Sequence, residues 1–204
     1  VVACNANRVL ADFLETGVYD RRRELKKTLS PSMGILVSSN LERLLYDLGG
    51  QDTGKVAAWM ADLREQGVYR VDGETLARIR EVFLARASDD NQALGAIRRV
   101  WLEHRYLMDP HTAVAKTVLD RYSKKADSPV HTILLSTANP FKFATEVLKA
   151  FELPDNDDFK NALRLSALTG NPIPSSISKL KNAPILHNKV CDIHEIPERV
   201  LEIL

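Results

Sequence analysis

The sequence predicts an α/β fold, and three observations support this prediction. The chain opens with the apolar run Val1-Val2-Ala3-Cys4, which is typical of a buried strand and leads directly into a helical pattern. A second strand-like run, residues 130–135, lies between two helical stretches, and this order is typical of a sheet covered on both faces. With 204 residues, the chain is long enough to bury one sizeable core.

The first elements follow from local patterns. Residues 6–16 have apolar side chains at helical spacing, and Gly17 is a fitting C-terminal stop. Residues 28–38 are expected to form a loop. The Ser-x-x-Glu pattern Ser39-Asn40-Leu41-Glu42 then predicts a capping box, which would open a helix that ends near Gly49-Gly50.

The middle of the chain is predicted to be mostly helical. Three stretches with an apolar stripe and charged opposite faces are expected to form helices, at about 54–66, 74–87 and 91–104. Because no strand pattern interrupts them, residues 53–105 are interpreted as a helical layer or insertion. The remaining parts, residues 1–52 and 106–204, are assigned to an α/β domain, with a C-terminal tail.

The last hundred residues alternate between element types. Asp109-Pro110 predicts an N-cap and a first-turn proline for a helix from about 110 to 123. The run 130–135 predicts a buried strand, and Asn139-Pro140 caps a helix that extends to about Leu153. A polar, proline-rich region follows, and the chain closes with a strand-like piece and a short helix from Ile196 to Leu204.

Composition excludes several classes of protein. The 28 basic and 27 acidic side chains give a net charge of +1, so neither nucleic acid nor an acidic membrane surface is expected as the main partner. No apolar run approaches the roughly 20 residues that span a bilayer. The only cysteines, Cys4 and Cys191, lie far apart in sequence, which predicts no disulfide framework and a cytoplasmic location. Because the chain opens inside a predicted strand, without methionine, we expect it to be a piece of a longer protein.

Three polar segments are candidates for a site. In the first, Ser38, Ser39 and Arg43 accompany a predicted helix N-terminus, a combination that favours an anion, although a well-capped surface helix is the simpler interpretation. In the second, Asp109 and His111 lie at the start of a predicted helix, where a histidine is more often structural than catalytic.

The third segment, residues 135–143, follows the predicted strand and precedes a helix. Ligands of open α/β sheets bind at such places, so Thr137 is a candidate ligand-binding hydroxyl, while an ordinary turn is the alternative. The spacing of His187, Cys191 and His194 is compatible with zinc, but three groups without a second cluster predict no metal site.

At these segments the chain resembles the bacterial-type threonine synthases, which are enzymes dependent on pyridoxal 5'-phosphate (PLP). Four short blocks match this family in order, and the resemblance runs from the first residue to at least Phe143. The blocks are Ser30-Pro31-Ser32-Met33, Ser38-Ser39-Asn40-Leu41-Glu42-Arg43-Leu44-Leu45, Asp109-Pro110-His111-Thr112-Ala113-Val114-Ala115 and Leu135-Ser136-Thr137-Ala138-Asn139-Pro140-Phe141-Lys142-Phe143.

The resemblance implies a fold, a cofactor and a reaction. The fold would be the C-terminal part of fold type II, the tryptophan-synthase-β-like α/β fold of PLP enzymes. The reaction would be the PLP-dependent conversion of O-phospho-L-homoserine and water to L-threonine and phosphate. In the family, the lysine that binds PLP covalently lies in the part that would precede Val1. No catalytic residue is therefore assigned here, an isolated piece is expected to be inactive, and the N-terminal half of the same enzyme is the expected partner.

The resemblance also implies roles for individual residues. Thr137 matches the threonine that forms a hydrogen bond with the pyridine nitrogen of PLP, and Ser136 is expected to border the cofactor. The residues expected to contact substrate are Ser38, Ser39, Arg43, Asp109, His111 and Lys142. Two positions depart from the family pattern: Gly34 stands where aspartate is usual, and Asn139 where histidine is frequent. A phospholyase acting on another phosphorylated amino acid and a non-catalytic domain of the same fold therefore remain alternatives.

Overall fold

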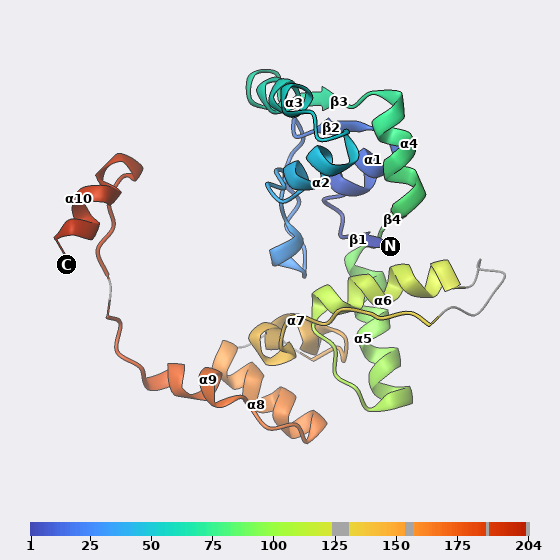
Figure 1. Ribbon diagram of the computed structural model, residues 1–204. Coiled ribbons are helices and arrows are strands. Elements are labelled where there is room, and N and C mark those ends of the chain that lie inside the picture. Colours follow the sequence, from blue (N-terminus) through green and yellow to red (C-terminus); the bar gives the residue numbers. More distant parts are fainter. Residues whose placement is uncertain (124–130, 154–156, 187, 203–204) are drawn as a thin grey trace.

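The computed structural model describes residues 1–123, 131–153, 157–186 and 188–202, and it shows two lobes followed by a C-terminal arm (Figure 1). The first lobe runs from the N-terminus to β4, and α5 begins the second lobe. The N-terminus lies where the two lobes meet, whereas the last described residues lie at the far end of the arm. In the described part of the chain, no helix is long and apolar enough to cross a membrane.

The first lobe combines short strands with helices around one core. Strands β1 and β4 pair in parallel, with Val2 opposite Ala85, and β2 and β3 pair antiparallel, with Tyr19 opposite Tyr69. The elements are β1 (Val2–Cys4), α1 (Val9–Thr16), β2 (Val18–Asp20), the 3₁₀ helix η1 (Pro31–Met33), α2 (Leu41–Leu48), α3 (Thr53–Glu65), β3 (Val68–Arg70), α4 (Gly73–Val82) and β4 (Ala85–Ala87).

Aromatic side chains fill the centre of this core. The rings of Tyr19 and Tyr69 stack, with centroids 5.3 Å apart and planes 6° apart, and Phe13 lies 5.7 Å from both. The chain reverses at Gly17, as predicted: its φ is 74°, and its N–H donates to the carbonyl of Phe13. A side chain at Gly17 would lie 3.1 Å from Leu76, so both the backbone angle and the close packing favour glycine.

In the second lobe and the arm, the regular elements among the described residues are all helices, joined by irregular segments. Helices α5 and α6 cross beneath the first lobe, and α7 and α8 pack beside them (Figure 1). The elements are α5 (Asp90–His104), α6 (Pro110–Ser123), η2 (Pro140–Phe143), α7 (Ala144–Lys149), α8 (Asp158–Thr169), α9 (Ser175–Ser178), η3 (Lys179–Asn182), η4 (Ile193–Glu195) and α10 (Ile196–Leu201). The predicted cap of Asn139 is confirmed, since its side chain accepts the N–H of Phe141 at 3.0 Å.

The predicted strand at 130–135 is wrong for its described residues, 131–135. These residues are extended but pair with no described strand, and Ile133 and Leu135 are 88% and 76% exposed. An apolar run becomes a buried strand only beside a neighbouring strand, and the side of this run that faces β1 borders a cavity instead. Val130 lies outside the described residues.

Three other local predictions also failed. Residues 53–105 were predicted to contain no strand, but β3 and β4 lie there. Each pairs with a strand that is distant in the sequence, β3 with β2 and β4 with β1. Ser39 forms no capping box, since the first N–H groups of α2 are taken by backbone carbonyls: Leu41 donates to Ser38 and Glu42 to Ser39. The strand-like piece near the end forms no strand in residues 188–202, where Val190 is 97% exposed and no described strand lies beside it.

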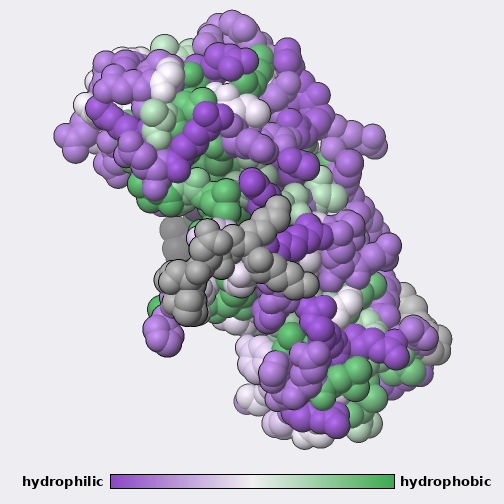
Figure 2. Space-filling view, turned by 90° about the vertical axis from the view of Figure 1, so that its right-hand side faces the viewer, coloured by the Kyte–Doolittle hydropathy of each residue, from purple (hydrophilic) through white to green (hydrophobic). Residues whose placement is uncertain are grey.

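Exposed apolar side chains mark the arm and the segment 131–137. On the arm they include Ile185, Leu186, Val190 and Ile193, each more than 75% exposed. By contrast, the face of the first lobe seen in Figure 2 is mainly hydrophilic, with hydrophobic residues visible between the hydrophilic ones and along the lower edge.

Candidate active site

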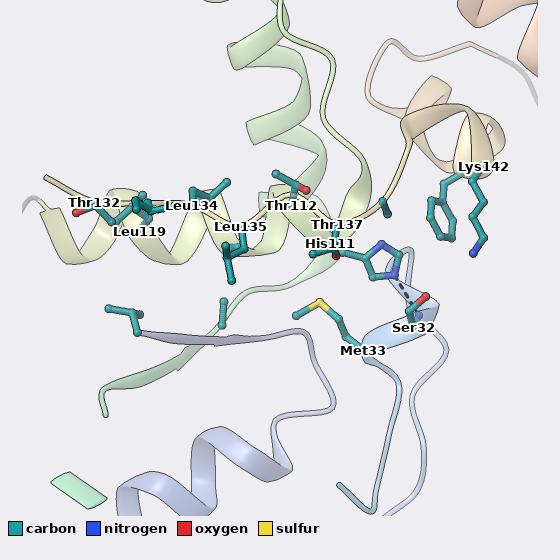
Figure 3. Close-up of a pocket in the computed structure, with 16 residues that line it drawn as sticks. Ser32, Met33, His111, Thr112, Leu119, Thr132, Leu134, Leu135, Thr137 and Lys142 are labelled. Carbon is teal, nitrogen blue, oxygen red and sulfur yellow. Dashed lines mark hydrogen bonds between the residues drawn. The ribbon is translucent and has the colours of Figure 1, made fainter. Parts of the chain in front are cut away.

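A cavity of about 560 Å³ lies at the junction of the two lobes (Figure 3). Strand β1 and the turn η1 form one wall, and α6 with the extended segment 132–138 forms the other. Its polar lining consists of Ser32, His111, Thr112, Thr132, Thr137 and Lys142. Segments more than 100 residues apart in the sequence therefore meet around one space.

The N-terminus of α6 holds a carboxylate–histidine pair. The side chain of Asp109 is fully buried, and its Oδ1 lies 2.8 Å from Nδ1 of His111 and accepts the backbone N–H of the same residue at 2.9 Å. The hydroxyl of Thr112 donates to Oδ2. Burial alone would raise the pKa of Asp109, but the hydrogen bonds from His111 and Thr112 outweigh it and hold the pKa below its usual value. Asp109 is therefore a fixed anion that accepts bonds.

The second ring nitrogen of His111 is also engaged. Its Nε2 accepts the backbone N–H of Ser32 in η1 at 3.1 Å, as Figure 3 shows. An Nε2 that accepts a hydrogen bond carries no proton, so Nδ1 carries it and donates to Asp109. The pair thus fixes His111 as the neutral Nδ1–H tautomer and joins α6 to η1.

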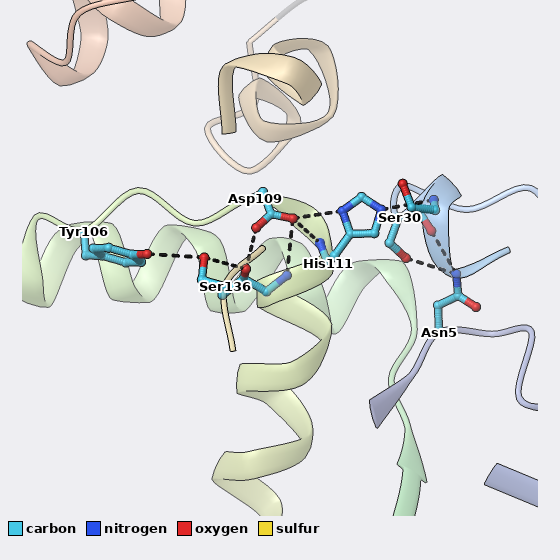
Figure 4. Close-up of polar contacts among 8 residues, drawn as sticks. Asn5, Ser30, Tyr106, Asp109, His111 and Ser136 are labelled. Carbon is cyan, nitrogen blue, oxygen red and sulfur yellow. Dashed lines mark hydrogen bonds and ion pairs between the residues drawn. The ribbon is translucent and has the colours of Figure 1, made fainter. Parts of the chain in front are cut away.

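The same network reaches the segment that contains Thr137 (Figure 4). The hydroxyls of Thr112 and Ser136 lie 3.0 Å apart, and Tyr106 approaches Ser136 at 3.4 Å. Ser136 therefore points away from the cavity, while the next residue, Thr137, lines it. Among the described residues, the Thr137 hydroxyl has no hydrogen-bond partner, so it is available to a ligand.

Comparisons with known proteins show which family this chain resembles. The family model "Threonine synthase, C-terminal" matches residues 112–203. Threonine synthase-like 1 of Macaca fascicularis is 33% identical over 94% of this chain and 26% of its own length. The structure of threonine synthase from yeast covers 98% of this chain and 41% of its own, with a TM-score of 0.79 and 27% identity. That of PLP-bound threonine synthase from Brucella melitensis covers 72% and 31%, with a TM-score of 0.67 and 36% identity.

The chain is similar to the threonine synthases along nearly its whole length. It corresponds to the C-terminal part and spans about a quarter to two fifths of the length of these relatives. The expected fold is confirmed as that of the PLP-dependent threonine synthases, and in this part of it helices predominate.

The residues present fit one side of a cofactor site of this family. The free hydroxyl of Thr137 lines the cavity as a hydrogen-bonding group, and the network through Ser136 holds its backbone. Lys142 also borders the cavity, with Nζ 5.6 Å from the ring of Phe143, and that ring packs edge-on against His111 at 4.7 Å. Thr137 and the cationic Lys142 therefore border the same space.

The predicted anion-binding group lies elsewhere. The Ser38 N–H donates to the hydroxyl of Tyr19 at 2.9 Å, and Arg43 donates to the side chain of Asn40 at 2.9 Å. Ser39 and Arg43 border a separate cavity of about 640 Å³ beside α2, which two carboxylates, Glu42 and Asp47, also line. The structure does not bring this group to Thr137, and its contact with substrate phosphate stays a prediction.

Sequence reasoning missed the residues that hold the turn 26–33. Asn5 donates to both the carbonyl and the hydroxyl of Ser30, at 3.1 and 3.0 Å, and Asn7 bonds both the N–H and the carbonyl of Lys26, each at 2.8 Å. The carboxylate of Asp90 accepts the N–H of Leu29 at 3.2 Å. Two asparagines directly after an apolar strand were the available signal, because a polar side chain in a buried stretch needs partners.

The weak metal pattern gains no support. His187 lies outside the described residues, and within the described part of the chain no three histidine, cysteine or acidic side chains gather closely enough to hold a metal ion.

Proposed function

We propose that this chain provides one side of the active site of a threonine synthase, which converts O-phospho-L-homoserine and water to L-threonine and phosphate. The single observation that carries the proposal is the free Thr137 hydroxyl in a cavity of a chain that is similar to the threonine synthases. When bound, PLP supplies a conjugated ring that takes up the electron pair left when a proton leaves the substrate.

Thr137 would hold the pyridine nitrogen of the cofactor. A hydroxyl can donate a hydrogen bond to an unprotonated nitrogen, whereas a carboxylate at this place would favour its protonation. An unprotonated ring is a weaker electron sink. This suits a reaction in which phosphate must leave and water must add.

Lys142 would supply positive charge at the open side of the cavity. Its ammonium group is exposed and rests over the ring of Phe143, so it can approach a phosphorylated substrate without leaving a buried partner. His111 and Asp109 already bond each other, so we assign them no direct contact with substrate phosphate.

The rest of the site would come from the remainder of the enzyme. Since the chain spans a minority of its relatives' length, the lysine that binds PLP and the loop for its phosphate are expected in that remainder. A cytoplasmic location also belongs to this proposal, and it agrees with the free thiols of Cys4 and Cys191.

The test is made on the complete gene product with PLP and O-phospho-L-homoserine, by following phosphate release and threonine formation in the same reaction. Equal amounts of both products are the expected result. Absence of both products, together with absence of PLP absorbance on the purified protein, would contradict the proposal and favour a non-catalytic domain.

A phospholyase is the second candidate, and two observations favour it. Relatives named threonine synthase-like match most of the chain, and Gly34 follows η1 where the family usually has aspartate. A side-chain carbon at Gly34 would lie 3.0 Å from the Pro31 carbonyl, so the turn is built tightly around glycine. Phosphate release without threonine would establish this alternative.

A further inference from the structure

The turn at residues 30–33 forms a wall of the cavity, and no regular ladder holds it. It lies in the long connection between β2 and α2, where η1 is its one short helical turn. Asn5 fixes Ser30 from the first lobe, and Asp90 fixes Leu29 from the start of α5. On the side of α6, the Ser32 N–H donates to His111, and this hydrogen bond joins η1 to α6 beside the cavity.

We infer that His111 is a positioning residue: it holds η1 against α6 through one fixed tautomer, and it thereby sets the distance between η1 and Thr137 across the cavity. The inference rests on the proposed function for its effect on catalysis, but its structural part does not depend on activity. This positioning role differs from the substrate contact that was expected for His111.

The geometry leaves His111 little freedom for any other role. Its side chain is 11% exposed, its Nδ1 lies 2.8 Å from the buried Asp109, and its Nε2 accepts from Ser32 at 3.1 Å. The ring of Phe143 packs edge-on against the imidazole and limits its rotation. A histidine that shuttles protons needs a free nitrogen facing the substrate, and both nitrogens here have partners within the protein.

The hydrogen bond between Ser32 and His111 belongs to a larger network. Asp109 also accepts from Thr112, whose hydroxyl contacts Ser136 at 3.0 Å. One continuous path of hydrogen bonds therefore runs from Ser32 to the residue before Thr137 (Figure 4). Since a buried network is stable only when every member is satisfied, the tautomer of His111 and the place of η1 depend on each other.

Two substitutions test the hydrogen bonds of the two ring nitrogens separately. His111→Gln places an acceptor near the position of Nε2 and can keep the bond from Ser32, whereas His111→Asn places a donor near Nδ1 and can keep only the bond to Asp109. His104→Asn is the matched control, because His104 lies on α5 with its side chain 67% exposed. Equal thermal unfolding temperatures of the variants would show that the comparison is made between folded proteins.

The first measurement is amide hydrogen exchange in the complete gene product, read on the peptide that contains Ser32. We expect His111→Asn to speed this exchange by roughly 2- to 10-fold, the effect of losing one hydrogen bond, while His111→Gln and His104→Asn leave it near the original rate. Unchanged exchange in His111→Asn would overturn the inference.

The second measurement is kcat/KM for threonine formation. We expect His111→Asn to lose activity and His111→Gln to recover most of it, because only the latter keeps the wall in place. Equal loss in both variants would overturn the positioning role, since it would show that the imidazole itself is needed. If the unmodified enzyme forms no threonine while the exchange results hold, the proposed function fails and the structural link between His111 and Ser32 stands.

Discussion

Asn5 and Ser30, 25 residues apart in the sequence, meet through two hydrogen bonds in which the Asn5 amide donates to the carbonyl and to the hydroxyl of Ser30. Both residues are 1% exposed. The amide also donates to Thr28 at 2.8 Å, so one side chain after β1 supports the whole entry to the turn.

Changing Asn5 to Asp is expected to destabilise the fold. The substitution keeps the shape but replaces the donating group by an oxygen, which would face the Ser30 carbonyl in a buried place. We expect the free energy of unfolding to fall by about 1–3 kcal/mol in chemical denaturation. Asn91→Asp, at an exposed position of α5, is the control and should change it by less than about 0.5 kcal/mol.

Substitutions of Thr137 should separate the hydroxyl from the shape of the side chain. Thr137→Val keeps the shape and removes the hydroxyl, and Thr137→Ser keeps the hydroxyl. We expect the valine variant of the complete enzyme to lose about 5- to 100-fold in kcat with altered PLP absorbance, and the serine variant to remain close to the original. Equal rates for both variants would remove Thr137 from the site.

The acid stability of the first lobe should depend on Asp72. Its carboxylate accepts the Thr75 N–H at 2.8 Å, and this hydrogen bond lowers the pKa of Asp72. Burial offsets part of this decrease, and Lys55 lowers the pKa further. A lowered pKa means that the stabilisation is present above about pH 4 and is lost as the pH falls below that value. Denaturant titrations from about pH 6 to about pH 3 should show a smaller loss in Asp72→Asn than in the original protein.

The loss of folding stability at high pH should depend on Tyr19. Burial raises the pKa of its phenol, only partly offset by the Ser38 N–H, so the folded protein resists its ionisation. The stabilisation is therefore present below about pH 10, where unfolded tyrosine begins to ionise, and is lost as the pH rises further. The loss should be smaller in Tyr19→Phe when unfolding is measured on both sides of that pH.

At neutral pH the same Tyr19→Phe change should cost stability. The Tyr19 hydroxyl bonds the Leu36 carbonyl at 3.0 Å and the Ser38 N–H at 2.9 Å, and both would lose their partner. A decrease of about 1–3 kcal/mol in the free energy of unfolding is expected. Tyr46→Phe, at a site where the residue is 37% exposed, provides the comparison, and an equal effect there would contradict the explanation.

Features encoded locally could be predicted from the sequence. The helices around α3, α5 and α6 follow from apolar spacing, and the stop at Gly17 and the cap at Asn139 each depend on a few adjacent residues. The run at 131–135 was misjudged because strand formation depends on neighbours in space. Ser39 has the residue type of a cap, but backbone carbonyls take the N–H groups that it would need.

The candidate site shows the same division. The family blocks pointed to Thr137 and His111, which do line one cavity. The contacts that build the cavity, such as Ser32 with His111 across 79 residues, are tertiary and leave no periodic pattern. Arg43 was predicted to contact substrate from its place beside Ser38 and Ser39 in the sequence, yet α2 carries it to another surface.

The pairing of β1 with β4 has a consequence for synthesis. Val2 and Ala85, which face each other in this parallel pair, are 83 residues apart. At roughly 5–20 residues per second, the ribosome needs about 4–17 s to make the second strand after the first. During that interval β1 lacks this partner, while Phe13 and Tyr19 are already available to pack together, so translation as well as stability can affect the order of folding within this lobe.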